Sequence, residues 1–568
     1  MILQPVVNIA EICARKGVQQ VVLSPGSRCA PLTLAFARHP KLSVRTVSDE
    51  RAAAFIGLGM AQKTGSPTVL VCTSGTAALN YAPAVAEAYF QQVPLLILTA
   101  DRPPEWIDQL DGQTIRQEQV YGRHIKESYT FPVDFDHPDA VWHSERLVSE
   151  ALNKAIAFPP GPVHINIPLR EPFYPAPGEA LVYSEGVKII EEEASIQTLG
   201  PDILAKLRRE FHQYERILVV AGQGDYDALL LPVLETFAQT TGAVIVGDII
   251  SNTQQSALVI RHQDTLLSCQ DDQQLALLRP DLLVTFGKSI MSKSLKVYLR
   301  KHPPKAHWHL QPAGQVADTF QSLTKIVRCS PRYFFTTVPE RQAFSLTYLH
   351  AWQGMERRAE NFLEEYVPAS GYNELHLVRQ ILRHLPAHSN LHLANSMAVR
   401  YANILALKPA QQVQVYANRG TSGIDGSTST AVGCALVSTQ PTVLITGDLA
   451  FFYDRNALWH NYLPQNLRIV LLNNHAGGIF RLIDGPRQQP ELAPYFETHQ
   501  ALDARNTARD FKMRYTAVTT LAELSEALPA FFSPTAGAAI LEVFTDSALN
   551  AKAFSEYKQA AGKLFSGI

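Results

Sequence analysis

The sequence contains few cysteines, and their spacing predicts neither a disulfide framework nor a metal site. Six cysteines are spread over 568 residues, and no two of them form a C-x-x-C pair. Cys72 and Cys434 lie within apolar stretches, where buried free thiols are the usual outcome. A scattered set of this kind favours a reducing compartment, so we expect a cytoplasmic protein.

Long hydrophobic runs and an excess of one charge are also lacking. No apolar stretch approaches the roughly 18–20 residues of a membrane-spanning helix, so we expect no integral membrane association. The N-terminal segment MILQPVVNIAEICARKG lacks the basic region and continuous apolar core of a signal peptide. The formal net charge is only −2, with 50 Lys and Arg against 52 Asp and Glu. Because this balance creates no attraction to polyanions, we expect no nucleic acid partner.

The sequence does contain a repeated alternation of predicted strands and helices. Segments such as VVLSPGSR, PTVLVCTSGT and PLLILTADRPP resemble strands that end in polar or Gly/Pro-rich loops, and helical stretches follow them. This order predicts an α/β fold, and 568 residues are too many for one core. We therefore predict three doubly wound parallel-sheet domains at residues 1–182, 196–345 and 346–568, with an exposed charged linker around residues 178–198.

A β-α-β unit near the C-terminus carries polar residues at both of its strand ends. Apolar runs at 441–446 and 467–472 predict two strands, which a right-handed crossover makes parallel. Asp448 and Asn474 therefore emerge at the same edge of the sheet, 26 positions apart (474 − 448). A carboxylate and a carboxamide there suit Mg²⁺, which prefers oxygen ligands. The alternative is that any doubly wound sheet places polar residues at strand ends, and this unit alone does not decide between the two.

Two strand ends in the N-terminal part have both a cofactor interpretation and a structural one. Asp49 and Glu50 open a predicted helix, where the first is a natural N-cap and the second is favoured by the helix dipole. Taken alone, these residues favour the structural interpretation, and the alternative is that Glu50 hydrogen-bonds a cofactor ring nitrogen. The loop Thr73-Ser74-Gly75-Thr76 presents amides at a helix N-terminus, which suits an anion or a polar ring. It is not a P-loop, because no Gly-Lys-Ser/Thr follows.

The middle of the chain offers two weaker motifs. Gly222-Gln223-Gly224 follows a predicted strand but lacks the third glycine of the dinucleotide fingerprint, so we interpret it as structural. His307 and His309 point to one side of a predicted strand without a third ligand nearby, which argues against a metal site.

Arginines recur at the predicted carboxyl ends of strands. Each of the segments SPGSR, TADRPP, NSMAVR and NRGTSGIDG holds one, namely Arg28, Arg102, Arg400 and Arg419. Arginine pairs carboxylates bidentately and keeps its charge when buried. Any one of the four taken alone is explained as a surface or structural residue, but four at such positions indicate substrates with several carboxylates.

Together these segments resemble one enzyme family. SPGSR, DERAAAF, CTSGTAALNY, LTADRPPE, NSMAVR, NRGTSGIDG, GDLAFFYDRNAL and NNHAGGIF are similar to motifs of the MenD family of thiamine diphosphate enzymes. These motifs cover the first and third predicted domains, whereas the middle one matches mainly by position. Leu449 replaces the last glycine of the general Gly-Asp-Gly motif, but leucine is usual in this family. Ala476 is a departure, because glycine is more usual there.

The resemblance implies a thiamine diphosphate-dependent transferase with Mg²⁺, or alternatively Mn²⁺, as its metal. It would decarboxylate 2-oxoglutarate and add the resulting succinyl carbanion equivalent to isochorismate in a 1,4 sense, in menaquinone or phylloquinone biosynthesis. In this family the site lies between the first domain of one subunit and the third domain of another. The resemblance therefore implies at least a homodimer, with a homotetramer as the alternative.

Family roles carry over to positions of this sequence that match the motifs. Glu50 would activate the aminopyrimidine of the cofactor. The implied cofactor contacts are Glu50, Thr73, Ile424, Asp448, Leu449 and Asn474, and the implied metal ligands are Asp448, Asn474 and the carbonyl of Ala476. The implied substrate contacts are Ser27, Arg28, Arg102, Gln113, Lys293, Ser396, Arg400, Arg419, Ile479, Phe480 and Ile483.

Two other functions compete with this one. A thiamine-dependent carboligase of the acetolactate synthase type would use a single keto acid with a small apolar partner, which does not explain the four arginines. A catalytically inactive regulator with the same fold is expected to have lost Glu50, Asp448 or Asn474, and all three are present.

Overall fold

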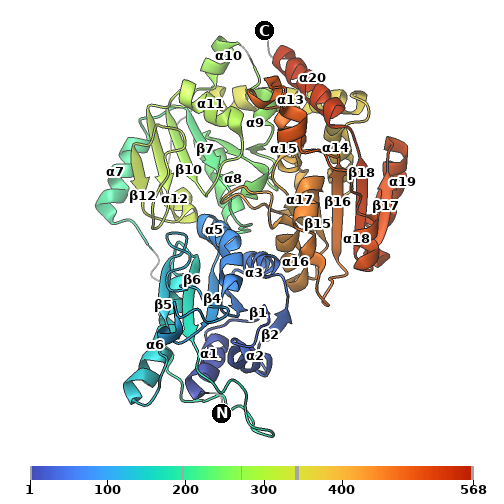
Figure 1. Ribbon diagram of the computed structural model, residues 1–568. Coiled ribbons are helices and arrows are strands. Elements are labelled where there is room, and N and C mark those ends of the chain that lie inside the picture. The colour runs from blue at the N-terminus through green and yellow to red at the C-terminus, as the bar shows by residue number, and fades with distance from the viewer. Residues whose placement is uncertain (1–2, 194–196, 270, 339–344, 565–568) are drawn as a thin grey trace.

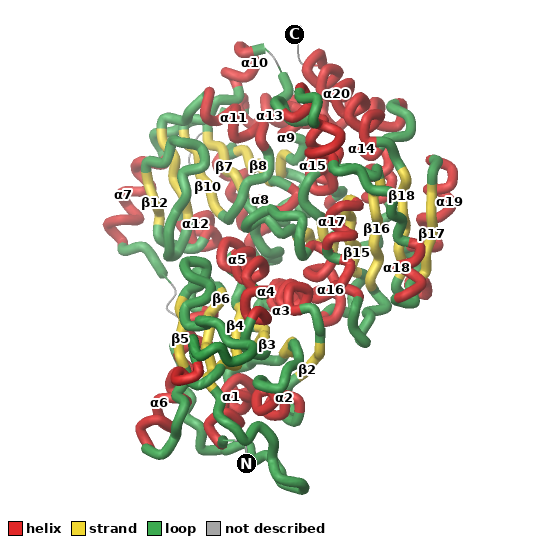
Figure 2. The backbone as a smooth tube through the Cα atoms, in the orientation of Figure 1, coloured by secondary structure: helices red, strands yellow, loops and turns green. Residues whose placement is uncertain are grey.

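The computed structural model describes residues 3–193, 197–269, 271–338 and 345–564, and it contains three parallel β-sheets flanked by helices (Figure 1). Each sheet has six strands, and every strand pairing is parallel. Figure 2 shows the three sheets as separate groups of strands with helices around them. The predicted fold class, three doubly wound α/β units, is confirmed.

The N-terminal sheet has the strand order β2-β1-β3-β4-β6-β5. Its β3 strand, TVLVC, is buried throughout, as expected for a strand covered by helices on both faces. The strands are β1 (Gln20–Leu23), β2 (Ser43–Thr46), β3 (Thr68–Cys72), β4 (Leu95–Asp101), β5 (Glu127–Thr130) and β6 (Pro162–Pro168). The helices are α1 (Gln4–Arg15), α2 (Ala30–Ala37), α3 (Glu50–Thr64), α4 (Thr76–Asn80), α5 (Ala82–Gln91) and α6 (Pro138–Ile156).

The middle sheet has the order β12-β11-β10-β7-β8-β9. The strands are β7 (Ile217–Ala221), β8 (Val244–Gly247), β9 (Val259–Ile260), β10 (Leu282–Phe286), β11 (Ala306–Leu310) and β12 (Lys325–Val327). The helices are α7 (Pro201–Phe211), α8 (Leu230–Thr241), α9 (Gln263–Leu266), α10 (Asp272–Leu277), α11 (Lys293–Lys301) and α12 (Pro331–Thr337). A Cβ on Gly222 would lie 2.5 Å from the carbonyl oxygen of Lys288, so this glycine serves the close packing of two loops.

The C-terminal sheet has the order β14-β13-β15-β16-β18-β17. The strands are β13 (Asn390–Leu393), β14 (Gln414–Tyr416), β15 (Thr442–Gly447), β16 (Leu467–Asn473), β17 (Arg514–Val518) and β18 (Ala539–Phe544). The helices are α13 (Thr347–Ala369), α14 (Glu374–Arg383), α15 (Met397–Leu405), α16 (Ser427–Val437), α17 (Asp448–Tyr453), α18 (Arg505–Asp510), α19 (Leu521–Phe531) and α20 (Ser547–Leu564).

The first and third sheets share one topology, because the order 2-1-3-4-6-5 recurs when each is numbered from its own first strand. Their corresponding helices α3 and α16 pack against each other across the domain boundary. A Cβ on Gly59 would lie 2.0 Å from the Thr430 carbonyl oxygen, and one on Gly433 would lie 2.0 Å from that of Ile56. Glycine at both positions therefore lets the two helix backbones approach closely.

Two segments that connect domains also pack against them. Helix α13 packs its first half, including Trp352, into the core of the middle domain and its second half, including Val367, into that of the C-terminal domain. Residues 194–196 of the segment predicted as an exposed linker lie outside the described residues. The described residues 178–193 are mostly exposed or half-buried, but they lie against the N-terminal domain, where Val187 is buried and the Ile190 carbonyl accepts a hydrogen bond from Asn153.

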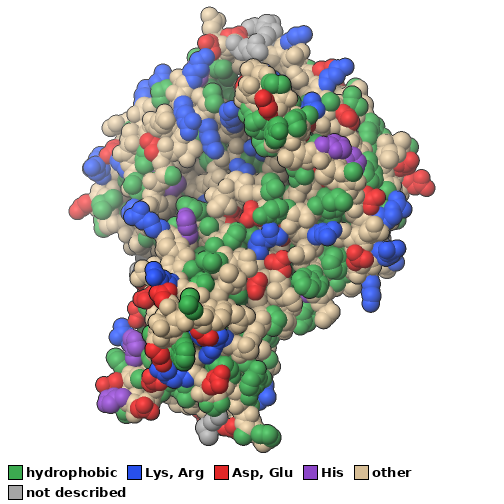
Figure 3. Space-filling model, in the orientation of Figure 1, with side chains coloured by type: hydrophobic (Ala, Val, Ile, Leu, Met, Phe, Trp, Pro, Cys, Tyr) green, Lys and Arg blue, Asp and Glu red, His purple; other side chains and the backbone are tan. Residues whose placement is uncertain are grey.

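The surface has a mixed charge. Figure 3 shows both Lys and Arg side chains and Asp and Glu side chains on this face, and the two signs are nearly equal in number over the whole chain. None of the helices in the described part of the chain has the length and apolar character of a bilayer-spanning segment.

The packing of α16 against α17 also buries a carboxylate, and this gives a pH prediction. Asp454 accepts hydrogen bonds from the Ser429 backbone nitrogen at 2.7 Å and from its Oγ at 2.8 Å. Burial raises the pKa of Asp454 from 3.8 to about 7. The folded protein therefore keeps a proton that the unfolded chain has already released. This group lowers stability as the pH rises from about 4 to about 7, by at most about 1.4 kcal/mol per pH unit.

Asp454→Asn is expected to remove that slope, because the amide does not titrate. The melting temperature of the variant minus that of the wild type should rise with pH between 4 and 7 and then level off. Calorimetry across this range checks it, and a pH-independent difference would contradict the assignment of the slope to Asp454.

Candidate active site

A cavity of about 440 Å³ opens at the carboxyl end of the C-terminal sheet. Loops that follow β13, β14, β15 and β16 form most of its wall, as the switch points of a doubly wound sheet predict. The structure brings together there the following residues singled out in the sequence: Ser396, Arg400, Arg419, Ile424, Asp448, Leu449, Asn474, Ala476, Ile479, Phe480 and Ile483.

Asp448 and Asn474 reach this cavity because β15 and β16 are adjacent parallel strands. Gly447 pairs in register with Leu472, so Asp448 and Asn474 leave the sheet at the same edge. Asp448 is then the first residue of α17, where the helix dipole favours a negative charge. The predicted crossover is thus present, with α17 and a 3-10 turn between the strands.

Two carboxylates in the cavity are buried without a cation. Asp448 is 2% exposed and accepts hydrogen bonds from the Leu449 backbone nitrogen at 2.9 Å and from Gln500 Nε2 at 2.8 Å. Glu374, also 2% exposed, accepts one from Asn474 Nδ2 at 2.8 Å. Burial raises the pKa of both carboxyls. Within the described ranges no Lys or Arg forms an ion pair with either, so the charge balance fits a bound cation.

The cation would have few protein side chains as ligands. No group of three or more His, Cys, Asp and Glu side chains that could hold a metal occurs among the described residues. Asp448, the amide of Asn474 and a backbone carbonyl would therefore leave coordination positions for the oxygens of a diphosphate, which is the usual arrangement for Mg²⁺.

Ala476 fits the position where glycine is more usual. Its φ is not in the left-handed region, which His475 occupies instead with φ 58°. Ala476 is buried, and its backbone nitrogen donates to Asn474 Oδ1 at 3.1 Å. The methyl group is therefore accommodated without backbone strain, and the carbonyl keeps a lone pair beside the hydrogen bond from Gly478.

Two guanidinium groups on the cavity wall have unused hydrogen-bonding capacity. Arg419 donates from Nη1 to Asn395 Oδ1 at 2.8 Å, whereas its Nε is buried without a partner. Arg400 donates to the backbone oxygen of Ser396. Burial lowers the pKa of both arginines, and neither forms an ion pair with a described residue. A substrate carboxylate would supply both the missing acceptor and the missing charge.

Apolar side chains complete the wall and remain accessible. Ile424 is 41% exposed and Ile483 is 43% exposed, and Ile479 and Phe480 line the same cavity. Large apolar groups that stay open at a concave site indicate that a ligand or another chain covers them.

A second group of predicted residues gathers on the N-terminal sheet. A Cβ on Gly26 would lie 2.3 Å from Thr73 Cβ, so the SPGSR loop packs directly on the TSGT loop. Thr73 Oγ1 and Ser74 Oγ are buried without hydrogen-bond partners, which leaves them free for a polar ring or an anion. Glu50 begins α3, is half-buried, and accepts a hydrogen bond from Asn80 Nδ2 at 3.4 Å.

The remaining N-terminal residues border these loops. Gln113 lies against Gly75, with its backbone 3.4 Å from the Cβ that Gly75 lacks. Arg28 donates to the Leu169 carbonyl at 2.9 Å, and exposed Ser27 precedes it. Arg102 forms an ion pair with Asp111 at 2.7 Å. The loops after β1, β3 and β4, together with the start of α3, thus form one surface.

The two groups are separate within one chain. The residues Glu50, Thr73, Ser27, Arg28, Arg102 and Gln113 are not among those that line the C-terminal cavity. Lys293 is not among them either and lies exposed at the start of α11. The sequence analysis did not identify Glu374 or Gln500. The sequence signal for Glu374 is its position as an acidic residue at the start of an amphipathic helix, and Gln500 has no such signal.

Comparisons with known proteins agree with this geometry. Residues 7–120 match the family described as "Thiamine pyrophosphate enzyme, N-terminal TPP binding domain", residues 202–393 match "Middle domain of thiamine pyrophosphate", and residues 396–543 match the corresponding C-terminal TPP binding domain. A protein of Cytophaga hutchinsonii named 2-succinyl-5-enolpyruvyl-6-hydroxy-3-cyclohexene-1-carboxylate synthase is 46% identical, over 98% of this chain and 99% of its own.

Proteins of the same name from Flavobacterium johnsoniae and Desulfotalea psychrophila are 38% and 36% identical, over 97% and 96% of this chain and 97% and 98% of their own lengths. The chain therefore belongs to the 2-succinyl-5-enolpyruvyl-6-hydroxy-3-cyclohexene-1-carboxylate synthases, a family of thiamine pyrophosphate enzymes.

Proposed function

We propose that this protein is a thiamine diphosphate-dependent transferase that decarboxylates 2-oxoglutarate and adds the succinyl group to isochorismate. The product would be 2-succinyl-5-enolpyruvyl-6-hydroxy-3-cyclohexene-1-carboxylate, an intermediate of menaquinone or phylloquinone biosynthesis. The single observation that carries the substrate assignment is the cavity that holds both Arg400 and Arg419 without ion-pair partners among the described residues. Two such guanidinium groups suit substrates that carry several carboxylates.

The residues present fit the cofactor. Asp448, Asn474 and the Ala476 carbonyl would hold Mg²⁺, Leu449 and Ile424 would contact the cofactor beside them, and Glu50 with Thr73 would hold its aminopyrimidine. When bound, thiamine diphosphate supplies the electron sink for the carbon that loses CO₂. Glu50 would share a proton with the aminopyrimidine nitrogen, Arg400 and Arg419 would orient substrate carboxylates, and Ile479, Phe480 and Ile483 would exclude water.

The separation of the two residue groups supports a homodimer as the smallest active unit. Neither group alone offers both Glu50 and the Asp448 cavity, so a second copy would bring its N-terminal surface to the cavity. We also propose the domain boundaries 1–182, 196–345 and 346–568 and a cytoplasmic location. The six cysteines, all buried and free of disulfides, support that location.

Arginine-to-lysine variants test the function. The wild type should consume 2-oxoglutarate and form the adduct only when isochorismate is present. Arg400→Lys and Arg419→Lys keep the charge but lose the planar fork. Each is expected to lower kcat/KM by about ten- to more than a hundredfold, equivalent to about 1.5–3 kcal/mol. The loss should fall mainly on one substrate at each position, while the Kd for thiamine diphosphate stays constant.

Arg28→Lys and Arg102→Lys extend the series to the N-terminal surface, and Arg514→Lys on the exposed edge strand β17 is the matched control. A wild type that prefers pyruvate to 2-oxoglutarate, or normal kinetics in all four variants, would contradict the dicarboxylate assignment. An acetolactate synthase type of carboligase would then be the better description.

A further inference from the structure

The loop that carries Arg419 is held by a buried carboxylate from a different domain. Glu87 lies in α5 of the N-terminal domain and is 2% exposed. It accepts hydrogen bonds from the backbone nitrogens of Gly420 at 2.8 Å and Thr421 at 2.6 Å, and from Thr421 Oγ1. A fourth comes from Gln91 Nε2. No described cation forms an ion pair with Glu87, so these donors are its direct polar partners, while its charge also acts on nearby Arg419.

The loop backbone lies directly against the last turn of α5. A Cβ on Gly420 would lie 2.8 Å from the Glu87 carbonyl oxygen and 3.1 Å from the Gln91 backbone nitrogen. Only glycine permits this approach, so steric contact and the carboxylate hydrogen bonds fix the same stretch of backbone.

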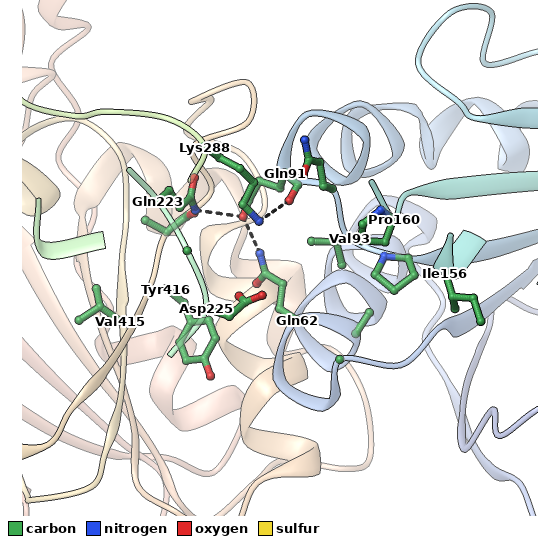
Figure 4. A pocket seen from close by; sticks show the side chains of 16 residues that line it. Gln62, Gln91, Val93, Ile156, Pro160, Gln223, Asp225, Lys288, Val415 and Tyr416 are labelled. Carbon is green, nitrogen blue, oxygen red and sulfur yellow. Dashed lines mark hydrogen bonds between the residues drawn. The ribbon is translucent and has the colours of Figure 1, made fainter. Parts of the chain in front are cut away.

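All three domains meet at Gln91, beside a cavity of about 160 Å³ shown in Figure 4. Gln91 Oε1 accepts from Gln62 Nε2 at 2.9 Å and from Gln223 Nε2 at 3.1 Å, and its backbone oxygen accepts from Lys288 Nζ at 2.7 Å. Gln223 also donates to the Ala417 carbonyl at 3.0 Å, at the start of the loop. The middle domain therefore contacts the loop directly through Gln223 and contacts Gln91 through Lys288.

These contacts hold the backbone on both sides of Arg419. Arg419 adjoins Gly420 in the chain, and the negative charge of Glu87 opposes the lowering of its pKa by burial. The neighbouring Asn395 donates to the Asn418 and Gly423 carbonyls, at 2.7 Å and 2.6 Å, and accepts from Arg419 Nη1. The guanidinium therefore belongs to a loop held by hydrogen bonds from both sides, it lines the cavity, and its Nε is buried without a partner.

We propose that Glu87 is a positioning residue for substrate binding: it fixes the 417–421 loop so that Arg419 meets a substrate carboxylate in the productive orientation. This inference rests on the proposed function. Glu87 lines neither the catalytic cavity nor, by its position in α5, any part of the predicted cofactor site. It acts through Arg419 and not on the reacting atoms.

Glu87→Gln is the direct test, because it keeps the shape but replaces one acceptor oxygen by a donor that faces backbone N–H groups. We expect kcat/KM to fall about 10- to 100-fold, since misplacing a binding group by an ångström has effects of that size. The fall should appear as a raised KM for whichever substrate Arg419→Lys affects, with the other KM and the Kd for thiamine diphosphate unchanged. In the double variant Glu87→Gln/Arg419→Lys, the loss should be clearly smaller than the product of the single losses.

Glu356→Gln is the matched control. Glu356 is also a buried carboxylate that accepts from two backbone nitrogens, those of Arg261 and His262, but it belongs to the middle-domain packing away from the 417–421 loop. The Glu356→Gln variant should have a lower melting temperature but no substrate-selective change in KM. If Glu87→Gln does not fold, Thr421→Val removes one donor to Glu87 and leaves the backbone intact, and we expect the same selective KM change at smaller size.

The outcomes separate the two proposals. No adduct from the wild type with both substrates refutes the proposed function itself. An active wild type with normal kinetics in Glu87→Gln and Thr421→Val refutes the positioning role. Equal losses for both substrates that multiply with Arg419→Lys refute it as well, because they indicate only a general structural role.

Discussion

Glu50→Gln is expected to reduce turnover by about 10²- to 10⁴-fold, which is the usual contribution of a positioned acid–base group. The amide has nearly the same shape as the carboxyl, but it cannot share a proton with a ring nitrogen. Rate measurements at saturating thiamine diphosphate, Mg²⁺ and both substrates check this.

The fold of the Glu50→Gln variant should be unchanged. The start of α3 is capped by Asp49, whose side chain accepts from the Ala52 backbone nitrogen at 3.1 Å and does not involve Glu50. The contact from Asn80 can be kept by the amide oxygen. Glu526→Gln, on the exposed side of α19, controls for the loss of one charge. Turnover near that of the wild type would show that Glu50 is only the first residue of a helix, and the thiamine chemistry would have to rest elsewhere.

Asp448→Ala is expected to abolish Mg²⁺-dependent retention of thiamine diphosphate. Asp448 would be the only anionic protein ligand of the metal, and its removal leaves the charge of the cation and the diphosphate without a protein partner. Titration calorimetry with thiamine diphosphate, with and without Mg²⁺, measures the effect directly.

In the cofactor-free protein, Asp448→Ala should not lower the stability of the fold. Asp448 is a buried carboxylate with a raised pKa and no cation among the described residues, so its removal relieves an unfavourable burial. The melting temperature of the cofactor-free variant is therefore expected to equal or exceed that of the wild type. Asp448→Asn separates charge from shape and should bind the metal more weakly than the wild type. Unchanged cofactor affinity in the alanine variant would place the metal away from Asp448.

The sequence alone predicted the longer strands, the helices that follow them and the β-α-β crossover near the C-terminus. Apolar runs of five to seven residues separated by amphipathic segments predict parallel strands and crossovers. The β15–α17–β16 unit follows those rules, so the placement of Asp448 and Asn474 at one edge of the sheet could be expected from the sequence. Short edge strands were missed, because β9 has only two residues, too few for a periodic pattern.

The family resemblance assigned roles that local pattern could not. From the sequence pattern alone, Glu50 can be explained either as the first residue of a helix or as a catalytic residue. In the structure it begins the capped helix α3 and is hydrogen-bonded to Asn80. Its role in catalysis stays a prediction, as do those of the arginines.

The tertiary structure decided which distant residues meet. Glu374 and Gln500 contact the Asn474 and Asp448 side chains from segments about 100 and 50 positions away, and neither has a local signal for that contact. Glu87 reads in the sequence as a polar residue on an alanine-rich helix, but packing of α5 on the 417–421 loop buries it under backbone donors. Hydrophobic periodicity predicts which face of a helix or strand is buried, and so it predicts contacts between elements that follow one another in the sequence. Contacts between domains depend on how whole faces of helices and sheets fit together, and only the folded chain specifies that fit.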